Sequence, residues 1–205
     1  PTGTGLIAQG SITVNAGKSR IYGGEVEMRF APTRNDLFTA VAQYLNGRYD
    51  ELTTANFSPT GAPVATGCRT LGSRAANPGV NAARFYDIDC SGKPTVQSPE
   101  WAFNLGYERT FPLGSALDLV FGARTNIETS RFLNSNYRPE EKQDGFMMSD
   151  AYVTLRAEGW SLTGFVNNIE DAEVLARAGT RPILDFPVGT LRPPRTYGVR
   201  VGFDF

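Results

Sequence analysis

The C-terminal residues 195–205 alternate between two kinds of side chain, and this alternation limits the folds open to the chain. Apolar and aromatic residues occupy every second position, namely Tyr197, Val199, Val201, Phe203 and Phe205. Glycine and polar residues fill the positions between them. A period of two indicates a β-strand with one apolar and one polar face. The segment is as long as a tilted transmembrane strand, which needs about 9–11 residues, whereas the usual globular strand has about 5–6.

Alternation or strand-like composition recurs along most of the chain, and helical periodicity is almost absent. The further candidate strands are residues 5–15, 23–30, 36–50, 101–108, 117–128, 147–157 and 159–170. Segment 5–15 is the least regular of them. Together with 195–205, they predict an all-β fold of about eight antiparallel strands.

The connections between the candidate strands differ strongly in length. The short ones cover residues 31–36, 112–115 and 157–159, and the long ones cover 52–96, 132–146 and 172–192. Short turns at one end and long loops at the other are typical of outer-membrane barrels, whose turns are periplasmic and whose loops are extracellular. We therefore expect an antiparallel transmembrane β-barrel with a periplasmic C-terminus and with 52–96 as a long extracellular loop.

The polar faces of the candidate strands are too hydrophilic for lipid, so we expect them to line the lumen. The lumen candidates are Glu25, Glu27, Arg29, Asn104, Glu108, Arg124, Asn126 and Glu128. The aromatic residues expected at the membrane interfaces are Tyr22, Tyr44, Trp101, Trp160 and Tyr197. In a soluble sandwich or a lipocalin-like barrel the same polar residues would face water. That alternative explains neither the strand lengths nor the asymmetry of the loops.

Composition argues against several classes of function. The chain has no histidine and a formal net charge of −1. Histidine is the commonest general base and metal ligand, and the sequence has no GxSxG, P-loop or HExxH motif. Nucleic-acid binders usually carry a basic patch, and no apolar run reaches the roughly 20 residues of a transmembrane helix. We therefore expect no catalysis, no metal or cofactor and no nucleic-acid partner.

The two cysteines, Cys68 and Cys90, both fall in the long polar connection 52–96. Two cysteines in one loop of an exported chain favour a disulfide. Closing a loop of this size would stabilise the fold by roughly 3 kcal/mol, because it restricts the unfolded chain. Two unrelated free thiols are the alternative.

Several motifs resemble those of the TonB-dependent outer-membrane receptors. Residues 193–205 (PPRTYGVRVGFDF) resemble the closing barrel strand of that family, which commonly ends on a phenylalanine that the barrel-assembly machinery reads. Residues 15–27 (NAGKSRIYGGEVE) are similar to the start of a recurring strand, and residues 98–107 (SPEWAFNLGY) to a strand descending into the barrel. Residues 160–171 (WSLTGFVNNIED) resemble the penultimate strand. The resemblance covers nearly the whole chain in order.

The resemblance implies active transport across the bacterial outer membrane through a barrel of about 22 strands that is filled by a plug domain. This chain would supply about the last eight strands, and the TonB complex would act through an N-terminal plug that the chain lacks. The implied partners are outer-membrane lipid, the TonB complex, the barrel-assembly machinery and a small solute such as a ferric siderophore, cobalamin or a glycan. Loop 52–96 is the predicted ligand-contacting element, and Arg69, Arg74 and Arg84 are its candidates for an anionic solute. A merely solvated outer surface is the alternative for these arginines.

Three other functions stay open at the level of sequence. The first is a complete small barrel of about eight strands with a structural or narrow-pore role. The second is an enzyme built on an outer-membrane barrel, for which the chain lacks a histidine. The third is a soluble β-sandwich binding module, which would need no detergent for extraction.

Overall fold

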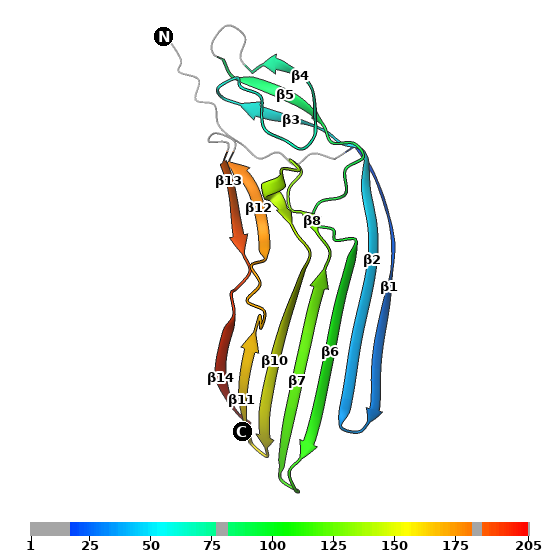
Figure 1. The fold of residues 1–205 in the computed structure, drawn as a ribbon, viewed down its shortest axis with the longest axis vertical. Helices are drawn as coiled ribbons and strands as arrows, with labels where there is room; N and C mark the ends of the chain where they lie inside the picture. The colour runs from blue at the N-terminus through cyan, green and yellow to red at the C-terminus, as the bar shows by residue number, and fades with distance from the viewer. Residues whose placement is uncertain (1–16, 77–81, 182–185, 205) are drawn as a thin grey trace.

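A computed structural model of the chain describes residues 17–76, 82–181 and 186–204 (Figure 1). Its main element is an antiparallel sheet in the order β1-β2-β6-β7-β10-β11-β14. The strands are β1 (Lys18–Thr33), β2 (Asp36–Glu51), β6 (Trp101–Pro112), β7 (Leu117–Glu128), β10 (Phe146–Ala157), β11 (Trp160–Asn167) and β14 (Thr196–Phe203). Strands β1 and β14 form the two edges of this open sheet. No helix in these residues is long and apolar enough to cross a bilayer.

The two ends of the sheet differ in the length of their connections, as the sequence predicts. Short turns join β1 to β2, β6 to β7 and β10 to β11 at one end, which we call the turn end (Figure 1). Gly114 and Gly159 in two of these turns have φ values of 91° and 76°, a conformation that favours glycine. The long connections lie at the opposite end, which we call the loop end. Strand β14 runs toward the turn end, where the described chain finishes (Figure 1).

The sheet has one polar and one apolar face, because residues paired across antiparallel strands place their side chains on the same side. One row crosses every strand of the sheet through Phe30, Phe38, Tyr107, Ala123, Ala151, Val166 and Tyr197. The adjacent row on the other face passes through Arg29, Thr39, Gly106, Arg124 and Asp150. On the apolar face, Tyr197 and Val199 are 83% and 71% exposed. Apolar side chains this exposed need lipid or another apolar partner.

The long connections contain secondary structure that the sequence analysis did not predict. The connection from β2 to β6 folds into a small sheet in the order β3-β5-β4, and the other two contain hairpins. Their elements are β3 (Thr53–Ser58), β4 (Arg69–Ala75), β5 (Arg84–Asp89), β8 (Arg131–Phe132), the 3-10 helix η1 (Pro139–Glu141), β9 (Lys142–Gln143), β12 (Leu175–Arg181) and β13 (Phe186–Leu191). A buried apolar cluster of Leu52, Tyr86, Ile88, Cys90 and Tyr137 lies among them. The packed core is therefore at the loop end, above a sheet that is exposed on both faces.

The candidate strands of the sequence analysis reappear as strands of the main sheet, with shifted ends. Segment 117–128 coincides with β7, whereas segment 23–30 is extended in β1 to Lys18–Thr33. The weak candidate 5–15 and the terminal Phe205 lie outside the described residues. The described part of the chain thus contributes seven strands to the main sheet, against about eight expected.

Candidate functional site

All of the predicted lumen residues lie on the polar face, and four of them form part of a cross-strand network. Arg124 pairs with Asp150 at 2.9 Å, and Asn126 donates a hydrogen bond of 3.0 Å to Asn104. Glu108 accepts a hydrogen bond from the hydroxyl group of Tyr152 in β10. This row of charged and amide groups can contact water, a polar solute or a polar protein surface, but lipid would leave these groups unsatisfied.

The predicted interfacial aromatics all lie on the apolar face. Tyr44 and Trp101 pair across β2 and β6 toward the loop end, with ring centroids 4.7 Å apart. Trp160 lies at the turn end, where it pairs with Phe203. Tyr22 follows the alternation of β1 on the same side, and Tyr197 is the second residue of β14. Val199, Val201 and Phe203, which were predicted to belong to an assembly signal, continue this face along β14.

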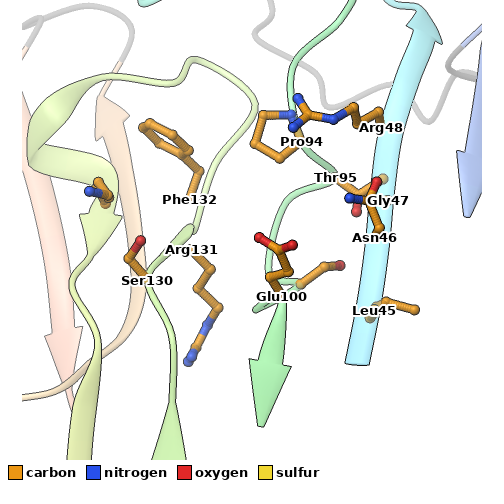
Figure 2. A pocket seen from close by; sticks show the side chains of 12 residues that line it. Leu45, Asn46, Gly47, Arg48, Pro94, Thr95, Glu100, Ser130, Arg131 and Phe132 are labelled. Carbon is orange, nitrogen blue, oxygen red and sulfur yellow. The ribbon is translucent and has the colours of Figure 1, made fainter. Parts of the chain in front are cut away.

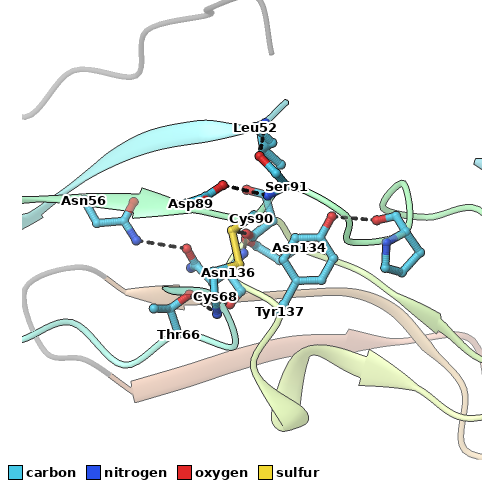
Figure 3. The surroundings of a disulfide bond; sticks show 12 residues. Leu52, Asn56, Thr66, Cys68, Asp89, Cys90, Ser91, Asn134, Asn136 and Tyr137 are labelled. Atoms are coloured by element: carbon cyan, nitrogen blue, oxygen red, sulfur yellow. Dashed lines mark hydrogen bonds between the residues drawn. A yellow bond between two sulfur atoms is a disulfide. The ribbon is translucent and has the colours of Figure 1, made fainter. Parts of the chain in front are cut away.

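A disulfide between Cys68 and Cys90 stands at the centre of the loop-end core (Figure 3). Its Cα atoms are 4.9 Å apart, and it joins the chain just before β4 to the residue just after β5. Cys90 is 1% exposed, so apolar packing surrounds the bond. The pairing predicted from the two cysteines is the one that the structure has.

The disulfide-bonded loop is tied to the connection between β7 and β10 through residues 134–137 (Figure 3). The backbone N–H of Gly67 and the hydroxyl group of Thr66 both donate to the Asn136 carbonyl oxygen at 2.8 Å. The Tyr137 hydroxyl group donates to the Pro94 carbonyl oxygen at 2.6 Å. Burial raises the pKa of Tyr137 above its ordinary value, which keeps its hydroxyl group neutral as a donor. The two connections therefore form one packed unit.

A second contact point joins three segments at the carboxylate of Glu128, the last residue of β7. Arg131 and Arg192 both form ion pairs with this carboxylate. Both guanidinium groups also lie over the ring of Phe146, at 5.8 and 5.0 Å from its centroid. Glu128 therefore holds the loop-end segments together, in addition to its predicted place on the polar face.

A pocket of about 200 Å³ opens between the loop ends of β2, β6 and β7 (Figure 2). Its lining comes from four segments that are distant in sequence, namely residues 45–48, 94–100, 130–132 and Lys142. Gly47 contributes no side chain, and Thr95 packs on it: an added Cβ would lie 2.2 Å from the Thr95 Oγ1 atom. Three of the lining residues, Arg48, Arg131 and Lys142, are cationic.

The arginines predicted to meet a solute are placed differently. Arg69 and Arg74 of β4 form ion pairs with Asp89 and Asp87 of β5. Arg84 donates a hydrogen bond to the hydroxyl group of Ser73. All three lie on the small sheet outside the pocket, and the cations that line the pocket come from other segments. Arg131 lies in a short stretch without periodicity or motif, so no sequence signal points to it.

The comparisons with known proteins agree with this arrangement. The sequence profile of the family described as TonB dependent receptor-like, beta-barrel matches residues 1–169. The chain belongs to this family. Its members are receptor and transport barrels of the bacterial outer membrane rather than enzymes, so the family implies outer-membrane transport and a TonB context. Searches of curated proteins and of solved structures found no match to the chain.

Proposed function

We propose that this chain forms wall, lumen lining and part of the outer mouth of a plugged, TonB-energised barrel that imports a scarce solute. The observation that carries the proposal is the division of one sheet into a polar and an apolar face, in a member of the TonB-dependent receptor family. Lipid would cover the apolar face, with Tyr44, Trp101 and Trp160 at the interfaces. The plug and the passing solute would face the row that contains Arg124 and Asn126.

The same proposal orients the barrel in the membrane. The long connections would be extracellular, with 52–96 as the largest loop, and the turn end and C-terminus would be periplasmic. The apolar residues Tyr197, Val199, Val201 and Phe203, with Phe205, would form the signal for the barrel-assembly machinery. Protease added to intact cells should then cut after Arg69 or Arg74 of the full receptor, while the turns stay uncut.

Uptake by whole cells tests the transport function. Three strains should be compared: the parent, a deletion of the gene that encodes this chain, and a TonB-deficient strain. The labelled solutes are ferric siderophores, cobalamin and oligosaccharides. We expect uptake of one of them to fall to background in both mutants, since import through such barrels needs energy from TonB. Deletion-sensitive uptake that is unchanged without TonB would contradict the proposal.

The mass of the protein in detergent-extracted outer membranes separates this function from the small complete barrel. A receptor with a plug and about 22 strands would be several times heavier than the 22.3 kDa of this chain. A mature protein near that mass would favour a barrel of about eight strands with a structural or narrow-pore role.

A further inference from the structure

The loop-end pocket carries more positive than negative charge. Among the residues that the structure describes, its lining includes Arg48, Arg131 and Lys142 and one carboxylate, that of Glu100. Two neighbouring carboxylates reduce the excess: Glu128 pairs with Arg131, and Asp144 lies 3.4 Å from the Lys142 ammonium group. The pair with Asp144 is weak, because the side chain of Asp144 is 86% exposed. Arg192 shares the Glu128 carboxylate, so the named residues carry four positive and three negative charges, a surplus of one positive charge among the described residues.

Arg131 is the residue of the pocket best placed to hold an anion. Its side chain is only 7% exposed, and its described ion pair uses one nitrogen, Nη1. The carboxylate that it contacts is shared with Arg192, so one negative charge serves two guanidinium groups. A guanidinium group has five N–H donors in a fixed fork, which matches the two oxygens of a carboxylate or phosphate. In contacts between described residues only Nη1 is engaged, so the other N–H donors of this buried, charged side chain can meet a ligand.

The other two cations are at the edge of the same space. Arg48 donates a hydrogen bond of 3.2 Å to the carbonyl oxygen of Gly92, which satisfies one donor without neutralising its charge. The Lys142 side chain is 40% exposed and can turn toward the pocket. Thr95 packs directly on Gly47, so these two residues form one wall of the pocket rather than free space. At about 200 Å³, the pocket is smaller than the roughly 300–1,000 Å³ of sites for whole drug-sized ligands. It fits one group of a larger solute.

We propose that this pocket binds an anionic oxygen group, a carboxylate or a phosphate, of the imported solute. Arg131 is the bidentate anchor, and Lys142 and Arg48 add charge at the rim. The proposal rests on the proposed function, since it makes the pocket a subsite on the import path. The position supports this, because Leu45 and Gly47 of the lining share the polar face with the row of Arg124, while Arg48 alternates to the other face of β2 and lines the pocket from its edge.

Anion binding can be measured on the purified full-length receptor in detergent. Its melting temperature should be titrated with sodium phosphate and, separately, with sodium citrate, each at constant ionic strength set with sodium chloride. A ligand that binds only the folded state raises the melting temperature. We expect a rise with at least one anion, and the more effective anion identifies the group. Arg131→Gln should weaken the apparent affinity about tenfold or more, because it removes a charge-assisted bidentate contact.

Arg69→Gln is the matched control, because it removes an exposed loop arginine that also pairs with an aspartate but lies outside the pocket. It should respond to the anions like the unmodified receptor. If Arg131→Gln does not fold, Lys142→Gln decides in its place, since that side chain is partly exposed. The proposal is overturned if the unmodified receptor responds to neither anion, or if the deciding variant responds as the control does.

The two proposals can fail separately. If uptake depends on TonB but the receptor does not respond to anions, the proposed subsite is wrong and the proposed transport function stands. An anion response that Arg131→Gln abolishes, without TonB-dependent uptake, keeps the subsite and removes the transport function.

Discussion

The hydroxyl group of Tyr137 donates a 2.6 Å hydrogen bond to the carbonyl oxygen of Pro94, and this bond joins the two long connections that flank β6 and β7. Tyr137 is 2% exposed, and its ring also contacts Phe132 and the Lys93 ammonium group. The walls of the loop-end pocket come from these same two connections and from residues 45–48 of β2. The shape of the pocket therefore depends on contacts that lie beside it.

The first prediction concerns this bond. Tyr137→Phe keeps the ring contacts and leaves the Pro94 carbonyl oxygen without its donor, so we expect a loss of about 1 kcal/mol in local stability. Hydrogen exchange of the full receptor should be faster in residues 90–97 and 133–137, with the main sheet unchanged. Tyr22→Phe, on the exposed face of β1, should change neither. Equal exchange in both variants would show that the bond contributes nothing.

The second prediction concerns the disulfide. Replacing Cys68 and Cys90 together by serine removes a covalent link between residues 22 positions apart. The expected loss is about 3 kcal/mol, confined to the loop-end core, because the loop regains conformational entropy when it unfolds. Limited proteolysis should then cut within 52–96 at a higher rate. The uncut barrel strands serve as the internal control, and unchanged loop proteolysis would contradict the expectation.

The third prediction compares two glycines. Gly47→Ala places a Cβ 2.2 Å from the Thr95 hydroxyl oxygen, whereas Gly24→Ala in the neighbouring strand meets nothing within 4 Å. We expect Gly47→Ala to destabilise the receptor by about 1–3 kcal/mol through overpacking and to weaken anion binding. Gly24→Ala should be close to neutral. Thermal unfolding measures the first effect, and the phosphate titration measures the second. Similar behaviour of the two variants would mean that Thr95 can move away from Gly47.

The fourth prediction concerns pH. Hydrogen bonds from Ser91, and then Arg69, lower the pKa of Asp89 from 3.8 to about 2 (Figure 3). A carboxylate with a lowered pKa in the folded state stabilises that state above its unfolded pKa. This contribution should therefore be complete above about pH 4 and should disappear between about pH 4 and pH 2. The melting temperature of Asp89→Asn should lack this component, and a full-size drop in that variant would assign the pH dependence to other groups.

The fifth prediction tests which face meets lipid. Leu105→Arg and Asn104→Arg change neighbouring residues that point to opposite faces of β6. An arginine on a lipid face costs about 2–4 kcal/mol near the middle of the membrane, whereas an arginine in the lumen stays hydrated. We expect Leu105→Arg to reduce the folded, heat-modifiable form of the receptor on gels, with little effect of Asn104→Arg. The reverse order would exchange the assignment of the faces.

Local sequence patterns predicted the strands of the main sheet, because every second residue of such a strand faces the same side of the sheet and therefore has the same polarity. The ends were less predictable: residues 18–22 of β1 do not alternate cleanly, and they form a strand because they pair with the end of β2, as in Lys18 with Glu51. In β5, the buried Tyr86 and Ile88 alternate with the less buried Phe85 and Asp87, but Phe85 is itself aromatic, so the sequence of β5 shows no clean alternation of polarity.

The pocket and its anchor could not be predicted in the same way. The role of Arg131 depends on its contacts with Glu128 and Phe146, which Arg192 shares. The sheet order and two hairpins bring these residues together. A short-range sequence pattern cannot predict a contact between segments that are this distant in sequence. The cysteine pair was predictable, because the chain has two cysteines and both lie in one long connection of a chain expected to be exported.

The double ion pair at Glu128 also has a mechanical consequence. The Glu128 carboxylate connects three segments. They are the end of β7, strand β8 through Arg131, and the segment that leads into β14 through Arg192. A push on any one of these segments is transmitted to the other two, and the covalent brace between Cys68 and Cys90 stiffens the neighbouring loop. Under the proposed function, such a rim would select a solute by shape, because a braced rim does not rearrange around a poorly fitting one.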